Sequence, residues 1–245
     1  MLTSGELERY ARQISIREVG QTGQERLKRA RIVIAGVGGL GSTTALYLAS
    51  AGVGTVRLID CDEVELSNLN RQVLHWTADI SRRKVASAAE KLKNINPTVS
   101  IQTVDQTITE ENIDTLVSDL DLIVDATDNL ETRFLLNRAA LRHRVPLFHA
   151  AVQAFEGRVM SIIPGRTACL ACVYRGVVPN YRVPVIGVTP AVIGSIQATE
   201  VIKYIVGVGN LLLDRLLVYD GLNMRFTEII VSRNSDCPHC RSVGK

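Results

Sequence analysis

The chain has 245 residues, of which 46% are hydrophobic and 22% are charged, and its 28 basic and 25 acidic side chains leave a net charge of only +3. This composition excludes a disordered or fibrous chain, and the scattered basic and aromatic residues argue against a nucleic-acid partner. Five cysteines are too few, and odd in number, for a disulfide framework. A reducing compartment is therefore expected.

Two segments bear on membrane targeting. Residues 1–9 carry acidic side chains early and no apolar stretch, so they do not resemble a signal peptide. The uncharged run at residues 183–199 has 17 residues, whereas a membrane span needs about 20 apolar residues. We therefore predict a cytoplasmic protein without a membrane partner.

After a charged, amphipathic opening that extends to about residue 29, short β-branched runs alternate with helical patterns. Strands are predicted at 31–36, 55–60, 99–104 and 121–125, and helices at about 40–52, 82–94, 110–118 and 130–143. This alternation is typical of a mostly parallel sheet with helices on both faces. Residues 30–145 are therefore predicted to form a Rossmann-like, nucleotide-binding half.

The pattern changes from residue 146. Two β-like stretches, 147–154 and 157–163, meet at Glu156-Gly157 and predict an antiparallel hairpin. The remaining expected elements are a loop-rich stretch at 164–189 with a crossing segment near 175–188, a helix at about 191–206, strands at 216–220 and 225–231, and a cysteine-bearing tail. The predicted fold class is α/β, with residues 1–245 forming one domain whose second half, 146–245, has a mixed sheet.

A glycine-rich turn follows the first predicted strand and opens the first helix of the sheet. It contains Gly36, Gly38, Gly39 and Gly41. Such glycines let backbone N–H groups approach an anion, and the helix N-terminus adds partial positive charge. Asp60, 24 residues after Gly36, can accept hydrogen bonds from ribose hydroxyls. Together these features predict an adenine nucleotide site, although the same pattern serves NAD and glycines can also serve helix packing alone.

Further polar residues follow the strands. They are Asp62, Ser67, Asn68 and Arg71 after the second strand, Lys84 at the next helix, and Asp128 and Asn129 after the fourth strand. Because the carboxyl ends of parallel strands line the ligand crevice, we expect these residues to converge. Triphosphate cleavage needs cations and a metal-binding acid, whereas hydride transfer needs a dry nicotinamide pocket. The charges favour phosphate chemistry over an NAD(P)-dependent oxidoreductase, although any single one can be an ordinary solvated side chain.

Several motifs recur in a fixed order from about residue 10 to residue 240. They are Arg9-Tyr10-Ala11-Arg12-Gln13, the glycine turn 36–41, Asp60-Cys61-Asp62, residues 67–72, Asn94-Ile95-Asn96-Pro97 and Thr127-Asp128-Asn129. This set resembles the MoeB/ThiF/HesA family of E1-like adenylyltransferases. The resemblance implies that the C-terminal glycine carboxylate of a small ubiquitin-like sulfur carrier protein attacks the α-phosphorus of Mg²⁺-bound ATP, giving an acyl adenylate and pyrophosphate.

The resemblance also implies roles for particular residues. Arg71 and Lys84 correspond to the family's phosphate contacts, Asp60 and Gly39 to its nucleoside contacts, and Asp128 to its metal-binding acid. Arg12 resembles an arginine that reaches the triphosphate from the partner subunit, which implies a homodimer. A general base is not required, because a carboxylate is already a nucleophile at neutral pH, and catalysis then depends on positioning and charge neutralisation.

Four of the cysteines form two C-x₂-C pairs, Cys169 with Cys172 and Cys237 with Cys240. Brought together by the fold, they would offer four thiolates to a structural zinc ion. A thiol oxidoreductase site at 237–240 and two disulfides are the alternatives, but no helix follows the second pair. The resemblance agrees with zinc, since many members tie the C-terminal tail to the body in this way. His239 is expected to point to solvent.

The fifth cysteine, Cys61, is expected to be a small buried residue. Many family members carry a cysteine in the crossing loop, where Val183 stands in this chain. The resemblance then implies no covalent thioester or persulfide on that loop, and sulfur delivery by a persulfide-donating sulfurtransferase or cysteine desulfurase. Two further hypotheses are a divergent enzyme that activates a peptide's C-terminus and a non-catalytic scaffold.

Overall fold

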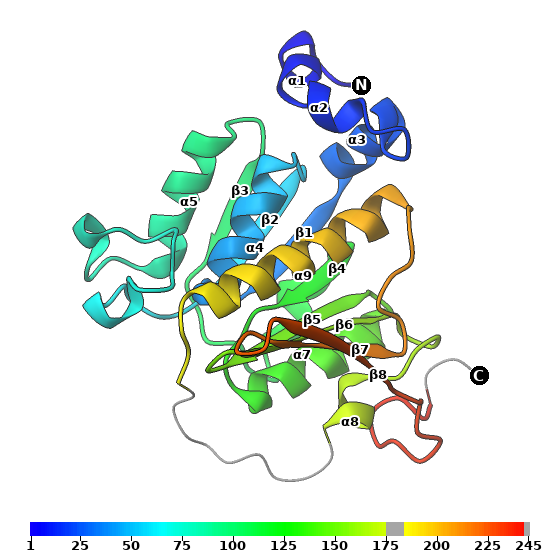
Figure 1. Ribbon diagram of the computed structural model, residues 1–245. Coiled ribbons are helices and arrows are strands. Elements are labelled where there is room, and N and C mark those ends of the chain that lie inside the picture. The colour runs from blue at the N-terminus through cyan, green and yellow to red at the C-terminus, as the bar shows by residue number, and fades with distance from the viewer. Residues whose placement is uncertain (175–183, 243–245) are drawn as a thin grey trace.

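The computed structural model describes residues 1–174 and 184–242. Within these residues, eight strands form one sheet in the order β3-β2-β1-β4-β5-β6-β7-β8 (Figure 1). The strands are β1 (Arg31–Ala35), β2 (Thr55–Ile59), β3 (Ser100–Val104), β4 (Leu122–Asp125), β5 (Leu147–Gln153), β6 (Glu156–Ile162), β7 (Arg215–Asp220) and β8 (Arg225–Ile230). The first five strands in this order, β3, β2, β1, β4 and β5, are parallel. Strands β6, β7 and β8 continue the sheet in antiparallel pairing. The predicted α/β fold class is confirmed.

The central strand β1 explains why helices cover both faces of the sheet. Ile32, Val33 and Ile34 are fully buried, and successive side chains of a strand point to opposite faces. Ile32 and Ile34 join one hydrophobic core and Val33 joins a second. An unbroken apolar run of this kind fits a strand that is buried on both sides.

The helices divide between these two cores. Leu27, Leu48, Leu92 and Ile193 belong to the first core, and Leu136 belongs to the second. The helices with these residues are α3 (Gly20–Arg29), α4 (Gly39–Ser50), α5 (Lys84–Ile95) and α9 (Val188–Val206) on one face, and α7 (Leu130–His143) on the other (Figure 1). Shorter helices are α1 (Ser4–Arg9), α2 (Ala11–Ile14), η1 (Leu66–Asn68), η2 (Thr77–Asp79), α6 (Ile113–Val117) and α8 (Leu170–Val173).

The N-terminal helices pack at the edge of the sheet where the parallel strands begin. Helix α1 starts with a capping box between Thr3 and Glu6. The Asn96 side chain, just after α5, donates hydrogen bonds of 2.7 Å to Tyr10 Oη and to the Ala49 carbonyl. These contacts fix α1 and α2 beside the C-terminal ends of α4 and α5.

The predicted hairpin between β5 and β6 is confirmed, but its turn was placed wrongly. Gln153 pairs with Glu156, so the turn is Ala154-Phe155, and Ala154 adopts a φ of 50°. Gly157 lies inside β6, where an added Cβ would be 2.1 Å from Ile193 Cγ1. This glycine therefore allows α9 to pack closely on the sheet and does not form the turn.

Two helices differ from their predicted bounds. Helix α9 begins at Val188 rather than near 191, because Pro190 occupies the first turn, where a missing N–H breaks no helical hydrogen bond. Helix α6 begins only at Ile113. The Asn112 side chain accepts a hydrogen bond of 2.8 Å from the Thr109 N–H, which holds residues 109–112 in a turn ahead of the helix. No helix of the described residues is long and apolar enough to span a bilayer. One sheet runs through both halves, which supports the single domain that we predict.

A buried ion pair beside α5 makes the stability of the fold sensitive to acid. Asp79 accepts hydrogen bonds from Lys91 Nζ at 2.5 Å and from the Trp76 N–H at 2.8 Å. Burial raises the pKa of Asp79, but these donors outweigh it and bring the pKa from 3.8 to about 2. The stabilisation is therefore complete above about pH 4 and is lost as the pH falls towards 2.

Replacing Lys91 with methionine is expected to lower the free energy of unfolding at pH 7 by about 1–3 kcal/mol, because buried Asp79 loses its buried cationic donor and keeps only the more exposed Arg82 as an ion-pair partner. The loss should shrink as the pH falls, since the less well paired carboxyl group takes up a proton more readily. Urea unfolding of both proteins at pH 7 and pH 3 measures this difference. An equal loss at the two pH values would contradict it.

Candidate active site

The glycine turn joins the carboxyl end of β1 to the first residues of α4. An added Cβ at Gly41 would lie 1.9 Å from the Gly36 carbonyl oxygen, so the start of α4 packs directly on the end of the strand. Gly36 has a φ of 90° and lies close to the loop after β4, with 2.7 Å from its added Cβ to the Ala126 oxygen. The turn therefore packs against the loop that follows β4.

We expect Gly41→Ala to destabilise the fold by about 3 kcal/mol or more, because the clash is with backbone and no side chain can rotate away. Gly5→Ala is the matched control, since an added Cβ at Gly5 meets nothing within 4 Å. Chemical unfolding of both variants measures the difference. Equal stability of the two would contradict the close packing at the turn.

Asp60 lies directly after β2 and holds the turn. Its Oδ2 accepts a hydrogen bond from the Val37 N–H at 2.7 Å, and its Oδ1 accepts one from the Asp62 N–H at 2.9 Å. Burial raises the pKa of Asp60, although the nearby Lys84 charge opposes this. Each carboxylate oxygen has a further lone pair, so Asp60 can hold the turn and still accept from a ribose hydroxyl.

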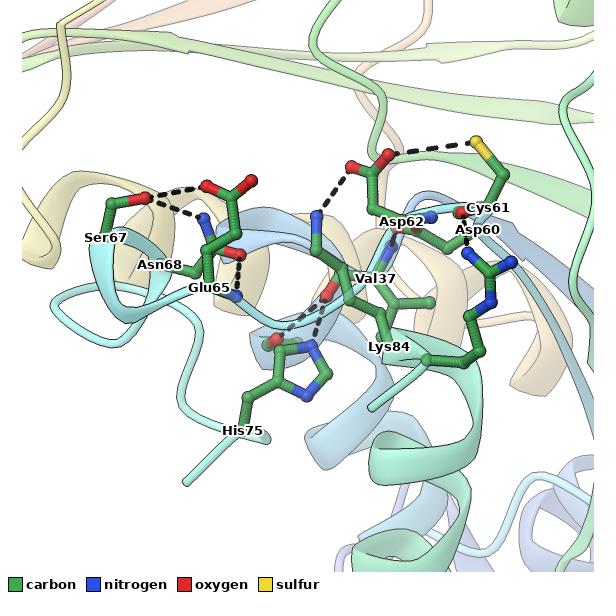
Figure 2. A network of polar contacts seen from close by, with 11 residues as sticks. Val37, Asp60, Cys61, Asp62, Glu65, Ser67, Asn68, His75 and Lys84 are labelled. Atoms are coloured by element: carbon green, nitrogen blue, oxygen red, sulfur yellow. Dashed lines mark hydrogen bonds and ion pairs between the residues drawn. The ribbon is translucent and has the colours of Figure 1, made fainter. Parts of the chain in front are cut away.

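Lys84 opens α5 and points towards the same edge (Figure 2). Its Nζ lies 2.8 Å from Asp62 Oδ2, and the lysine side chain is only 8% exposed whereas that of Asp62 is 63% exposed. A lysine ammonium has three donors, and this pair occupies one of them. The site therefore contains a buried cation whose carboxylate partner reaches into solvent.

Arg71 lies in the loop that continues from η1. Its Nη1 donates to the Ser67 carbonyl at 2.8 Å and to Asn70 Oδ1 at 3.0 Å. The Arg71 carbonyl lies 3.4 Å from where a Cβ of Gly39 would be, so this loop packs on the glycine turn. Asn68 is buried and accepts from the Glu65 N–H at 3.1 Å. Ser67 and Asn68 thus shape the loop that presents Arg71.

Gln72 follows Arg71 and is almost fully buried. Its Nε2 lies 3.6 Å from where a Cβ of Gly38 would be, and within the described part of the chain its Oε1 has no hydrogen-bond partner. A buried oxygen without a donor is costly. A ligand group that donates a hydrogen bond could satisfy this oxygen.

The loop after β4 contains two acids with different surroundings. Asp125 is fully buried; it accepts hydrogen bonds from the N–H and the hydroxyl of Thr127 at 3.1 and 2.7 Å and lies 2.7 Å from His149 Nδ1. Asp128 is exposed, and Asn129 caps α7. The Asp128 carboxylate is therefore open to solvent at the carboxyl edge of the sheet. Asp125 instead shapes the loop through its hydrogen bonds to Thr127, and Asn129 caps the first turn of α7.

Arg12 does not join this cluster within one chain. It is exposed on α2, and the neighbouring Gln13 donates to the carbonyl of Ala51, the residue after α4, at 3.2 Å. The glycine turn is at the other end of α4, and twelve residues of helix span about 18 Å. Arg12 therefore lies at the far end of the helix from the site.

The four paired cysteines form one buried cluster between α8 and the C-terminal tail. Their sulfur atoms all lie within 4.8 Å of one another. Three of the separations are 3.6, 3.7 and 4.0 Å, close to the edge of about 3.8 Å that a tetrahedron with Zn–S bonds of about 2.3 Å has. Burial and the neighbouring sulfurs raise the pKa of the Cys169 thiol. The cluster could therefore hold a metal ion, whose charge would favour the thiolate form.

A model of the ThiF family matches residues 10–239. The chain belongs to this family. It is 40% identical to the SAMP-activating enzyme E1 of Haloferax volcanii, covering 99% of this chain and 92% of that protein, and 41% identical to the sulfur carrier protein adenylyltransferase of Thermus thermophilus, covering 97% and 92%. The solved structure of E. coli MccB with ATP has the same fold, with a TM-score of 0.87 at 24% identity over 97% of this chain and 75% of that chain. The resemblance drawn from the motifs is confirmed.

In this ThiF-family chain, His239 differs from its expected place. It is half-buried, its Nδ1 lies 3.0 Å from Asn137 Nδ2, and its ring packs edge-on against Phe134. The Asn137 carbonyl oxygen accepts from the Leu170 N–H at 2.9 Å, so the amide nitrogen donates to His239. The expectation that His239 points to solvent was wrong, since it links α7 to the cysteine-bearing tail.

The expectation for Cys61 was also wrong, and that for Val183 is untested. Cys61 is exposed, because it is the second residue after β2 and lies where the chain leaves the sheet. Its Sγ is 3.8 Å from Asp62 Oδ1. Val183 lies outside the described residues, as does most of the predicted crossing segment.

The sequence analysis missed two buried histidines of the ThiF-family chain. His75 lies behind the glycine turn, with Nε2 3.0 Å from the Val37 carbonyl oxygen, and His149 pairs with Asp125. Neither belongs to a motif with a recognisable spacing. For His75, the only signal is its place beside apolar residues at 73, 74 and 76.

Proposed function

We propose that this chain is an ATP-dependent adenylyltransferase that activates the C-terminal glycine carboxylate of a small ubiquitin-like sulfur carrier protein. The observation that carries the proposal is the meeting of the glycine turn, the carboxylate of Asp60 and the cationic side chains of Lys84 and Arg71 at one edge of the sheet. The names of the two relatives, an adenylyltransferase and an E1 enzyme, support it and favour adenylation over hydride transfer.

The nucleotide would bind across the carboxyl edge of β1 and β2. Asp60 would accept from the ribose hydroxyls, and the backbone of Gly38 and Gly39 would approach the phosphates at the start of α4. Lys84 and Arg71 would neutralise the phosphate oxygens. Gln72, whose Nε2 lies beside Gly38 and whose Oε1 lacks a donor among the described residues, supports a ligand that has a donor group as well as phosphates, as a nucleotide does.

Asp128 is the residue that we propose as a Mg²⁺ ligand. Its exposed carboxylate suits an ion that prefers oxygen ligands and is usually held by one or two carboxylates together with substrate phosphates. Bound Mg²⁺ would supply Lewis-acid neutralisation of the triphosphate. The hydrogen bonds that Asp125 accepts from Thr127 would keep the Asp128 loop in place.

The reaction needs positioning more than proton transfer. A carrier carboxylate oxygen forms a bond to the α-phosphorus, the bond from that phosphorus to the β-phosphate oxygen breaks, and pyrophosphate leaves with the electron pair. The carboxylate is already ionised at neutral pH. Lys84 and Arg71 would then balance the charge that develops on the phosphate oxygens, with Lys84 exchanging its pairing to Asp62 for one to phosphate.

A homodimer belongs to the same proposal. Arg12 lies at the far end of α4 from the turn of its own chain, so it could reach a triphosphate only in another copy of the chain. Mixing an Arg12→Ala protein with an Arg71→Ala protein would test this, since a mixed dimer contains one intact site. Recovery of activity on mixing is expected, and two inactive proteins that stay inactive together would contradict shared sites.

We also propose that Cys169, Cys172, Cys237 and Cys240 hold a structural Zn²⁺ ion that ties the tail to α8. Convergence of all four sulfurs favours this over a separate redox pair at 237–240. Sulfur would come from a persulfide-donating sulfurtransferase or a cysteine desulfurase, because a cysteine at position 183 is not present to carry it. A cytoplasmic location stays a prediction.

The proposed function is tested by incubating the purified protein with MgATP and a carrier that ends in Gly-Gly. Intact-mass spectrometry is expected to show carrier whose mass has increased by one AMP. The same carrier without its terminal glycine is the control. Pyrophosphate release without any adenylated carrier would contradict the proposal.

A further inference from the structure

His75 contacts the backbone of the glycine turn from behind. Its residue is 4% exposed, and its Nε2 lies 3.0 Å from the Val37 carbonyl oxygen. A carbonyl oxygen only accepts, so Nε2 carries the proton of this hydrogen bond. Burial lowers the pKa of His75, which keeps the ring neutral. The other ring nitrogen, Nδ1, is then an acceptor.

Ser87 completes the link to α5. Its Oγ lies 2.9 Å from His75 Nδ1, and because Nδ1 is the acceptor, the serine hydroxyl donates. Lys91 Nζ in turn donates to the same Oγ at 3.3 Å. Ser87 is three residues beyond Lys84, about one turn along the same helix. The imidazole therefore connects the helix that presents Lys84 to the turn that would receive the phosphates.

Val37 is held from both sides of its backbone (Figure 2). Its N–H donates to Asp60 and its carbonyl accepts from His75. The residue directly precedes Gly38. A small rotation of this unit would move the N–H groups of the turn relative to Lys84, and rigid support of this kind decides how well a site is preorganised.

We propose that His75, relayed by Ser87, is a positioning residue that sets the glycine turn relative to Lys84 for nucleotide binding. The inference rests on the proposed function only in requiring that the chain binds ATP. His75 acts through Val37 and does not touch the nucleotide. The competing explanation is a core histidine that contributes to stability alone.

The test measures the Kd for MgATP by calorimetry and the thermal unfolding of the same variants. His75→Leu leaves the Val37 carbonyl without its donor and is expected to weaken ATP binding by about tenfold. His75→Gln, whose side-chain amide can donate to Val37, is expected to restore most of the affinity. His143→Leu is the matched control, because His143 on α7 pairs with Asp114 on α6, away from the glycine turn.

Ser87→Ala keeps the imidazole of His75 and removes only the hydrogen bond from the Ser87 hydroxyl to it. This variant therefore tests the positioning role of His75 if His75→Leu fails to fold. We expect a higher Kd and a KM for ATP that rises more than kcat falls. Unchanged ATP affinity in Ser87→Ala and in a folded His75→Leu protein, with only a lower melting temperature, would overturn the proposal.

ATP binding by the parent protein distinguishes a failure of the proposed function from a failure of the positioning role of His75. Binding without carrier adenylation would contradict the proposed function and leave the role of His75 to the Kd comparison. A parent protein that binds no ATP would contradict both.

Discussion

Arg71→Ala is expected to abolish carrier-dependent adenylation while leaving the fold intact. The side chain is half-buried, and among the described residues its hydrogen bonds stay within its own loop, to Ser67 and Asn70, so its loss removes little structural support. Its proposed work is to neutralise charge on the triphosphate, and removing one such donor costs about 10²–10³ in rate. The measurement is ATP–pyrophosphate exchange at saturating carrier, together with the thermal unfolding midpoint.

The matched control for this prediction is Arg29→Ala. Arg29 is exposed on α3, where it forms a weak ion pair of 4.0 Å with Glu25, so exchange should be unchanged. Near-normal turnover in Arg71→Ala would contradict the phosphate role. A strongly lowered melting temperature would instead mean that the loop needs the side chain for folding.

Cys237→Ser is expected to remove the bound zinc and to lower the unfolding midpoint by about 10 °C or more, because metal binding contributes directly to folding. The tail meets the body at this cluster, where the Asn234 N–H also donates to Cys172 Sγ at 3.5 Å, and at the contact of His239 with Asn137. Elemental analysis of the purified protein and a thermal scan with and without a chelator measure both effects.

Cys61→Ser is the control for the zinc prediction, since Cys61 is exposed and outside the cluster. It should keep full zinc content and stability. A parent protein that contains no zinc, or one that a chelator strips without any loss of stability, would contradict the structural metal site.

The parallel half of the fold could be predicted because its central strands, β1 and β4, are buried on both faces. Runs such as 32–34 are apolar without alternation, which separates them from half-buried strands. Once the strands are placed, the rule that ligands lie at their carboxyl ends brings Asp60, Lys84 and the loop of Asp128 to one edge. The apolar pattern of each strand and the order of the elements along the chain are therefore enough to predict these positions.

Other features depend on packing that a single sequence does not display. A glycine in a sequence can mean either a turn or a close approach of two backbones. At Gly157, the packing of Ile193 against the strand shows that the glycine serves close approach. Asp125 and Asp128 lie three residues apart, yet one is fully buried and the other is exposed. Whether a loop residue such as His75 points inwards depends on which segments meet behind it.

The most direct test of the account is ATP–pyrophosphate exchange by the purified protein with a panel of small ubiquitin-fold proteins that end in Gly-Gly. The account predicts exchange with at least one carrier, lost when the terminal glycine is removed. No exchange with any carrier, in a protein that binds MgATP normally, would contradict adenylation of a sulfur carrier. It would favour a scaffold or the activation of another carboxylate.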